Sequence, residues 1–201
     1  MKTRMVYRSE LEKLTNDVIK MGSLIELQIN DMITALNKID VERAKEIIAR
    51  DDSIDLMEHD IEKECIVLIA KQQPIASDLR RVTSIMKIIT DIERIADHCS
   101  DISEYIIKLS SEKRRNLPAH LIEMVLAMKK MVADTIDSFV YEDLKKAKSV
   151  GEADDGVDEL FERIRLEIEE EIRAVSYTHL DVYKRQLQHR KELPWKKQKR
   201  F

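Results

Sequence analysis

The chain contains one helical pattern twice. Residues 14–69 and 117–172 align without a gap at a constant offset of 103 positions. The matched pairs include Leu14 with Leu117, Met21 with Met124, Asp31 with Asp134, Asp51 with Asp154, Asp55 with Asp158, Ile61 with Ile164 and Glu64 with Glu167. A repeat at a fixed offset indicates one packed unit that has been duplicated. The sequence therefore predicts two related units in tandem.

Apolar residues recur at spacings of three and four along the chain, which is the signature of amphipathic helices. We expect five helices, at about residues 8–38, 42–72, 74–109, 118–141 and 143–173. Asp40 is a predicted N-cap of the second helix. Pro74 ends that helix and begins the next, because proline disrupts a helix interior but fits a first turn.

The predicted third helix carries the most regular apolar row, which we expect to face the core. Its members are Ile85, Ile88, Ile92, Ile95, Cys99, Ile102, Ile106 and Leu109. This heptad-like spacing is typical of long helices that pack side by side. Two short turns followed by a long helix favour an antiparallel three-helix bundle. The predicted fold is all-α, with two tandem three-helix bundles, the second lacking its native third helix.

Composition and charge exclude some classes of function. Charged residues make up 37% of the chain and aromatic residues 4%. Residues 175–201 contain eight basic and two acidic side chains, so residues 1–174 carry −10 although the whole chain carries −4. An acidic body repels phosphate backbones, so we expect no nucleic-acid binding.

No apolar run reaches 18 residues and no secretory leader is recognisable, so we expect no membrane insertion and a cytoplasmic location. Cys65 and Cys99 fit small buried hydrophobes in a reducing compartment.

The repeat breaks after Arg173. The second copy should continue as residues 72–81 do, but residues 174–186 read AVSYTHLDVYKRQ. This segment resembles the translation of two inverted transposase-recognition ends used in sequencing libraries. We interpret residues 174–201 as an artefactual or unrelated tail, residues 1–112 as the first unit and residues 113–173 as a partial second unit. The alternative is a genuine, divergent ending.

One acidic constellation stands out. Glu93, Asp97 and Asp101 are four residues apart, so they form a stripe along one helix face. Like charges so placed repel, and a bound cation would turn that repulsion into ligation. Carboxylate oxygens suit Mg, Mn, Fe or Zn. Helical geometry, however, places this stripe roughly opposite the isoleucine row, so a solvated acidic face is the competing interpretation.

Asp31 and Asp134 are weaker candidate ligands. They occupy equivalent positions of the two copies and could complete a metal site from a neighbouring helix. An ordinary surface charge pair is the interpretation we favour for both.

Three ordered motifs then resemble the PhoU family. They are Asp51-Asp52 with Ile54-Asp55, the run from Gln72 to Arg81, and the run from Asp91 to His98, and the likeness covers residues 1 to about 173. The resemblance implies a pair of three-helix bundles and a regulator, not an enzyme. It implies negative regulation of phosphate uptake and phosphate-starvation signalling, with a phosphate ABC transporter ATPase and a sensor histidine kinase as partners, and a homodimer.

The resemblance also implies metal. Some family members bind divalent or iron-type cations through a Glu/Asp-x-x-x-Asp motif in each repeat, which here falls on Glu93 and Asp97, with Asp101 extending the stripe. The second motif would fall at Lys196 and Arg200, which cannot ligate a cation in that way. We therefore expect no second metal site, and a second bundle that is not independently stable.

Two other functions remain open. PhoU-like domains also regulate sodium–phosphate or potassium transport systems, usually next to a membrane segment. A helical di-metal enzyme is the other alternative, but such enzymes use Glu-x-x-His pairs, and this sequence has none.

Overall fold

The computed structural model describes the backbone of residues 2–112 and 117–191, and the side chains of residues 5–112 and 117–174. The described chain is all-α. Its five helices are α1 (Lys2–Lys38), α2 (Val41–Gln72), α3 (Ala76–Ser110), α4 (Leu121–Val140) and α5 (Leu144–Lys191). Helix α5 continues past the predicted end at about Arg173. None of the described helices has an apolar stretch long enough to cross a bilayer.

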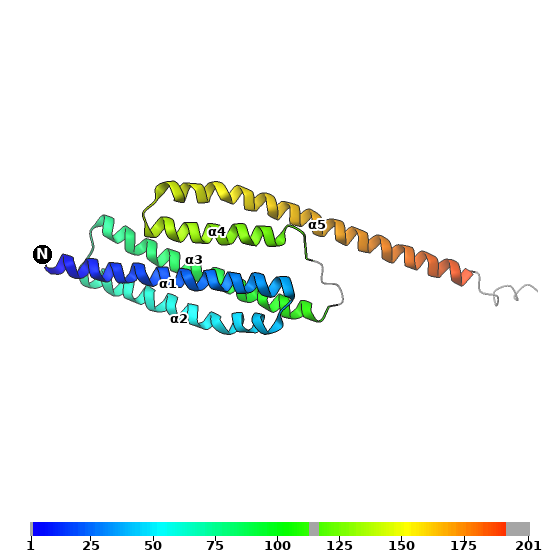
Figure 1. Ribbon diagram of the computed structural model, residues 1–201, viewed down its shortest axis with the longest axis horizontal. Helices are drawn as coiled ribbons and strands as arrows, with labels where there is room; N and C mark the ends of the chain where they lie inside the picture. The colour runs from blue at the N-terminus through cyan, green and yellow to red at the C-terminus, as the bar shows by residue number, and fades with distance from the viewer. Residues whose placement is uncertain (1, 113–116, 192–201) are drawn as a thin grey trace, which may run out of the picture.

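Helices α1, α2 and α3 form the first unit, an antiparallel bundle in which each helix packs on the other two. Helices α4 and α5 form a hairpin that lies along this bundle, and α4 packs on α1 (Figure 1). The far part of α5 projects beyond the bundle (Figure 1). The predicted all-α fold built of packed helices is confirmed, and in the described residues the second unit consists of two helices, α4 and α5.

The two copies share their turn chemistry as well as their helices. Ile39 and Glu142, which are 103 positions apart, both adopt a positive φ, of 51° and 54°. The residue after each is an aspartate that caps the next helix. Asp40 accepts the Arg43 backbone N–H at 3.1 Å, and Asp143 accepts the Lys146 backbone N–H at 3.0 Å. A side-chain acceptor at this position satisfies a backbone donor that the first helical turn leaves free.

Helix α2 ends as its sequence predicts. Gln73 adopts a left-handed conformation with φ 43°, and its N–H donates to the Ile69 carbonyl. Pro74 follows, and α3 begins at Ala76, two residues later than predicted.

The core row of α3 is rotated from the prediction. Ile85, Ile92, Cys99 and Ile106 are buried, but so is a second row formed by Val82, Ile89, Ala96 and Ser103. The other predicted row, formed by Ile88, Ile95, Ile102 and Leu109, is only half-buried. The cause is that α3 packs on both α1 and α2, so its buried stripe is wider and turned toward α2. The predicted isoleucine row was therefore partly wrong.

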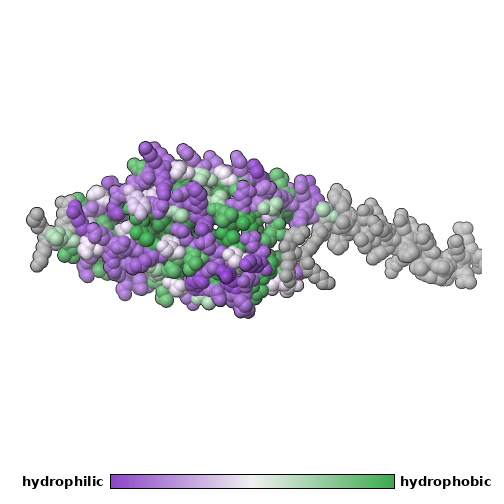
Figure 2. Space-filling model, in the orientation of Figure 1, coloured by the Kyte–Doolittle hydropathy of each residue, from purple (hydrophilic) through white to green (hydrophobic). Residues whose placement is uncertain are grey.

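The half-buried row faces an open groove. The groove has a volume of about 740 Å³ and lies between α3 and α4, with α1 and α5 contributing to its walls. Its α4 residues include Leu121, Met124 and Met128, which are the repeat equivalents of Val18, Met21 and Ile25, all fully buried in the first unit. Hydrophobic surface is visible along the middle of the molecule (Figure 2). The groove thus exposes apolar positions of α4 whose equivalents on α1 lie in the core.

Candidate metal centre

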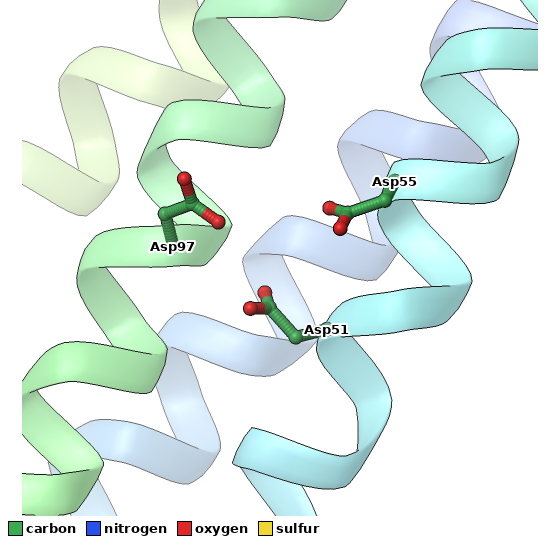
Figure 3. Close-up of side chains that lie close together, drawn as sticks. All are labelled: Asp51, Asp55 and Asp97. Carbon is green, nitrogen blue, oxygen red and sulfur yellow. The ribbon is translucent and has the colours of Figure 1, made fainter.

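Two acidic pairs meet where α2 packs on α3. Asp51 and Asp55 are four residues apart on α2, and Glu93 and Asp97 are four residues apart on α3. Carboxylate oxygens of Asp51, Asp55 and Asp97 all lie within 4.8 Å of one another. Figure 3 shows the three side chains pointing into the space between the two helices. A single cation could therefore contact all three residues.

Glu93 stands beside this group. Burial is the main cause that raises the pKa of Glu93, and the charges of Asp97, Asp55, Glu58 and Asp51 raise it further. Thr90 donates to Glu58 Oε1 at 3.0 Å and so orients that carboxylate one turn along α2.

Asp51 is the most enclosed member. Burial raises its pKa, and the charges of Asp97, Asp55 and Asp52 add to the rise. The nearby Ser100 hydroxyl acts in the opposite direction and lowers the pKa of Asp51. The two side chains approach each other without reaching ordinary hydrogen-bond geometry. Asp51 Oδ1 is buried without a hydrogen-bond partner. A buried carboxylate oxygen without a partner carries a free-energy cost that a bound cation would remove.

The donor set fits a hard or borderline cation. Among the described residues, the charged side chains that shift the pKa values of Asp51 and Glu93 are all acidic. The close group contains only carboxylates, with no thiolate or imidazole. Oxygen ligands of this kind suit Mg²⁺, Mn²⁺ or Fe, and also Zn²⁺.

The structure separates the three residues of the predicted stripe. Asp97 belongs to the close group and Glu93 flanks it. Asp101 lies one turn further along α3, where its side chain is 72% exposed and sits 4.0 Å from His98 Nδ1. The rotated core row explains this, because it brings Glu93 and Asp97 to the edge facing α2 and leaves Asp101 toward solvent.

The structure also shows why Asp31 and Asp134 recur. Asp31 accepts hydrogen bonds from Arg43 and Arg50, both at 2.9 Å. Asp134 pairs with Lys130 at 2.8 Å and with Lys146 at 3.5 Å. Arg43 and Lys146 are repeat equivalents, so each aspartate ties its helix to the start of the next one. Neither Asp31 nor Asp134 belongs to the acidic group of Asp51, Asp55 and Asp97.

Sequence reasoning did not select Asp51 and Asp55 as ligands. A signal for them existed, because they match Asp154 and Asp158 at the repeat offset with the same four-residue spacing. Asp154 and Asp158 are exposed on α5, and the second unit's predicted counterparts, Lys196 and Arg200, lie outside the described residues.

Fold and site together define an all-α protein of two related helical units, with a cluster of acidic side chains where two helices pack together. A PhoU domain pattern matches residues 18–106 and 121–181. The chain belongs to the PhoU domain family.

Curated relatives and solved structures agree with this assignment. A phosphate-specific transport system accessory protein PhoU homolog of Clostridium acetobutylicum is 43% identical over 163 residues, which are 81% of this chain and 74% of that protein. The PhoU protein of Escherichia coli K12 is 34% identical over 158 residues, which are 79% of this chain and 66% of that protein. The crystal structure of PhoU from Pseudomonas aeruginosa has a TM-score of 0.79 at 34% identity, covering 85% of this chain and 84% of that one.

Proposed function

We propose that this chain is a non-enzymatic, cytoplasmic negative regulator of phosphate uptake and phosphate-starvation signalling. The observation that carries the proposal is the 43% identity to a relative named as a phosphate-specific transport system accessory protein. Its partners would be the ATPase of a phosphate ABC transporter and a phosphate-sensing histidine kinase, and the chain would act as a homodimer. Long, charged helix surfaces and an open apolar groove are features that serve protein contact.

Pull-down of the two partners tests the adaptor role. The transporter ATPase and the cytoplasmic part of the kinase are offered to the immobilised chain, once with Mn²⁺ and once with EDTA. We expect at least one of them to be retained. Retention of neither in either buffer would contradict the adaptor role. Retention of a sodium–phosphate or potassium transport protein instead would support regulation of another transporter class, which is the second candidate function.

We propose further that the acidic group binds a divalent or iron-type cation that supports this regulation. The ligands would be Asp51, Asp55, Asp97 and Glu93. The positive charge of the metal would stabilise the contact between α2 and α3. Two observations support this assignment. Asp51 Oδ1 has no hydrogen-bond partner, and the described side chains whose charges shift the pKa values of Asp51 and Glu93 are all acidic.

Elemental analysis of single and double variants tests the metal proposal. Glu93→Gln with Asp97→Asn should remove the bound metal, as should Asp51→Asn. Asp101→Asn is the matched control, since Asp101 lies on the same helix one turn away from Asp97 and outside the close group, and it should leave the metal content unchanged. Loss of metal in Asp101→Asn would instead add the third residue of the stripe to the site. Asp31→Asn and Asp134→Asn should leave the metal content unchanged. If the double variant kept the metal content of the wild type, Glu93 and Asp97 would not be ligands.

A further inference from the structure

Gln28 is an unusual residue in the core of the first unit. It lies on α1 with an exposed fraction of 0%, among side chains that are otherwise almost all apolar. The buried polar residues of the described chain are Gln28, Ser100 and Ser103. Burying an amide costs free energy unless its donors and acceptors are satisfied, so its presence needs a reason.

The amide makes one contact that joins two helices. Gln28 Nε2 donates to the Ala96 carbonyl of α3 at 3.3 Å. The orientation of the amide follows from chemistry, because a carbonyl can only accept and so must face the NH₂ group. Gln28 Oε1 is left buried without a partner. Gln28 and Ala96 therefore form a single hydrogen bond between α1 and α3 inside an otherwise apolar core.

The link falls at the level of the acidic group. Ala96 directly precedes Asp97. In an α-helix the Ala96 carbonyl also receives the Ser100 N–H, and Ser100 lies beside Asp51 on α2. Gln28, Ala96, Ser100 and Asp51 thus connect α1, α3 and α2 at one height of the bundle, beneath the place where Asp97 meets Asp51 and Asp55.

The duplicated sequence provides an internal comparison. The repeat equivalent of Gln28 is Met131, an unbranched side chain of similar length that cannot donate a hydrogen bond. The fold of an α1-type helix therefore does not require an amide at this position.

We propose that Gln28 is a positioning residue, which sets the register of α3 against α1 so that Glu93 and Asp97 stand opposite Asp51 and Asp55. Apolar contacts tolerate sliding, whereas a single buried polar contact specifies one register at a cost in stability. A slip by one residue moves a side chain by about 1.5 Å along the axis and about 100° around it. Either change would separate the carboxylates that now lie within 4.8 Å. The metal-binding part of this inference depends on the proposed metal site.

Gln28→Met, the residue of the second copy, tests the proposal, with Ser103→Ala as the matched control. Ser103 is also buried and polar, but its hydroxyl donates to Cys99 within its own helix. Mn²⁺ binding to each chelator-treated protein is measured by calorimetry, and thermal unfolding is followed by circular dichroism. We expect Gln28→Met to bind Mn²⁺ at least tenfold more weakly while its midpoint of unfolding stays equal or rises. Ser103→Ala should bind Mn²⁺ as the wild type does.

A metal-independent measurement separates this inference from the proposed function. Spin labels at Lys20→Cys and Glu104→Cys report the axial offset of α1 and α3 by pulsed electron resonance, and the buried Cys65 and Cys99 are poorly accessible to the label. We expect a narrow distance distribution in the wild type that broadens in Gln28→Met, or shifts by at least the about 1.5 Å of a one-residue slip. If the wild type binds no Mn²⁺ but the distance changes, the metal proposal fails and the register role stands. Gln28→Asn, which keeps the amide but is too short, should behave as Gln28→Met does, and it serves if Gln28→Met does not fold. Unchanged distances together with unchanged Mn²⁺ affinity would overturn the proposal.

Discussion

Gly22 of α1 faces Ile136 of α4 so closely that a Cβ atom at position 22 would lie 2.7 Å from Ile136 Cδ1. Ile136 is itself buried, with 8% exposed. The absence of a side chain at Gly22 therefore lets α4 approach α1, and this contact is the main attachment of the α4–α5 hairpin to the first unit. A nearby hydrogen bond from Lys129 to Asn30, of 2.8 Å, supports the same contact.

We expect Gly22→Leu to detach α4 without unfolding the first unit. Overpacking of this kind costs about 1–3 kcal/mol, and the strain falls on the contact between α1 and α4. Hydrogen exchange should accelerate across residues 121–170 while residues 10–105 remain protected. Gly22→Leu combined with Ile136→Ala should restore much of the protection, because the smaller residue makes room for the larger. Equal acceleration in both units would contradict this account.

The wild-type second unit should already exchange faster than the first. Ile25 and Cys65 are fully buried, whereas their repeat equivalents Met128 and Ile168 are 47% and 44% exposed. Each such side chain forgoes part of the about 1.5–3 kcal/mol that full burial contributes. Protection across residues 120–170 should therefore be lower than across residues 10–105. Comparable protection in the two ranges would show that the hairpin is stabilised by something other than its own core.

These packing differences show which features the sequence could predict. Helix number, the Asp40 cap and the stop at Pro74 follow from local spacing and turn chemistry, and the structure has all three. The repeat also extends to the positive φ of Ile39 and Glu142, because both turns must make the same reversal. Local rules suffice where the determinant lies within a few residues.

Features that depend on two or more helices were harder to predict. The heptad-like row on α3 gave the correct seven-residue spacing but not the direction of the buried stripe, which depends on α3 contacting α1 and α2 together. That rotation places Glu93 and Asp97 on the edge of α3 next to α2, where Glu93 is half-buried and Asp97 stays exposed. Asp51 and Asp55 were missed for the same reason, since spacing within α2 does not reveal which of its faces meets α3.

The ion pairs of Asp31 should matter for stability and not for metal. Its side chain is 17% exposed and bridges Arg43 and Arg50. Charge-assisted hydrogen bonds of this kind contribute about 1.5–3 kcal/mol, so Asp31→Asn should lower the free energy of unfolding by about that amount in urea titrations. Asp134→Asn should have a smaller effect, because its lysine partners are single-point contacts on a more open surface. If Asp31→Asn lost metal while keeping its stability, the aspartate would be a ligand instead.

The acidic group should make the metal-free protein respond to pH in a defined direction. Burial and neighbouring carboxylates raise the pKa values of Asp51 and Glu93 above their ordinary values of 3.8 and 4.5. A raised pKa in the folded state means that the ionised form destabilises the fold. This cost is present above the folded pKa values, is relieved as the pH falls through them, and is absent below the ordinary values.

Asp51→Asn with Glu93→Gln should therefore raise the midpoint of thermal unfolding at pH 7.5 in EDTA, and the difference from wild type should shrink as the pH approaches 4. Asp134→Asn is a control of opposite sign, because Lys130 lowers the pKa of Asp134 and its ionised form stabilises the fold. Added Mn²⁺ should reverse the order at pH 7.5, because the wild type gains stability from a ligand that the double variant cannot bind. Calorimetric scans at pH 4, 5.5 and 7.5 measure all three proteins. A difference independent of pH would mean that the carboxylates are solvated and do not act on one another.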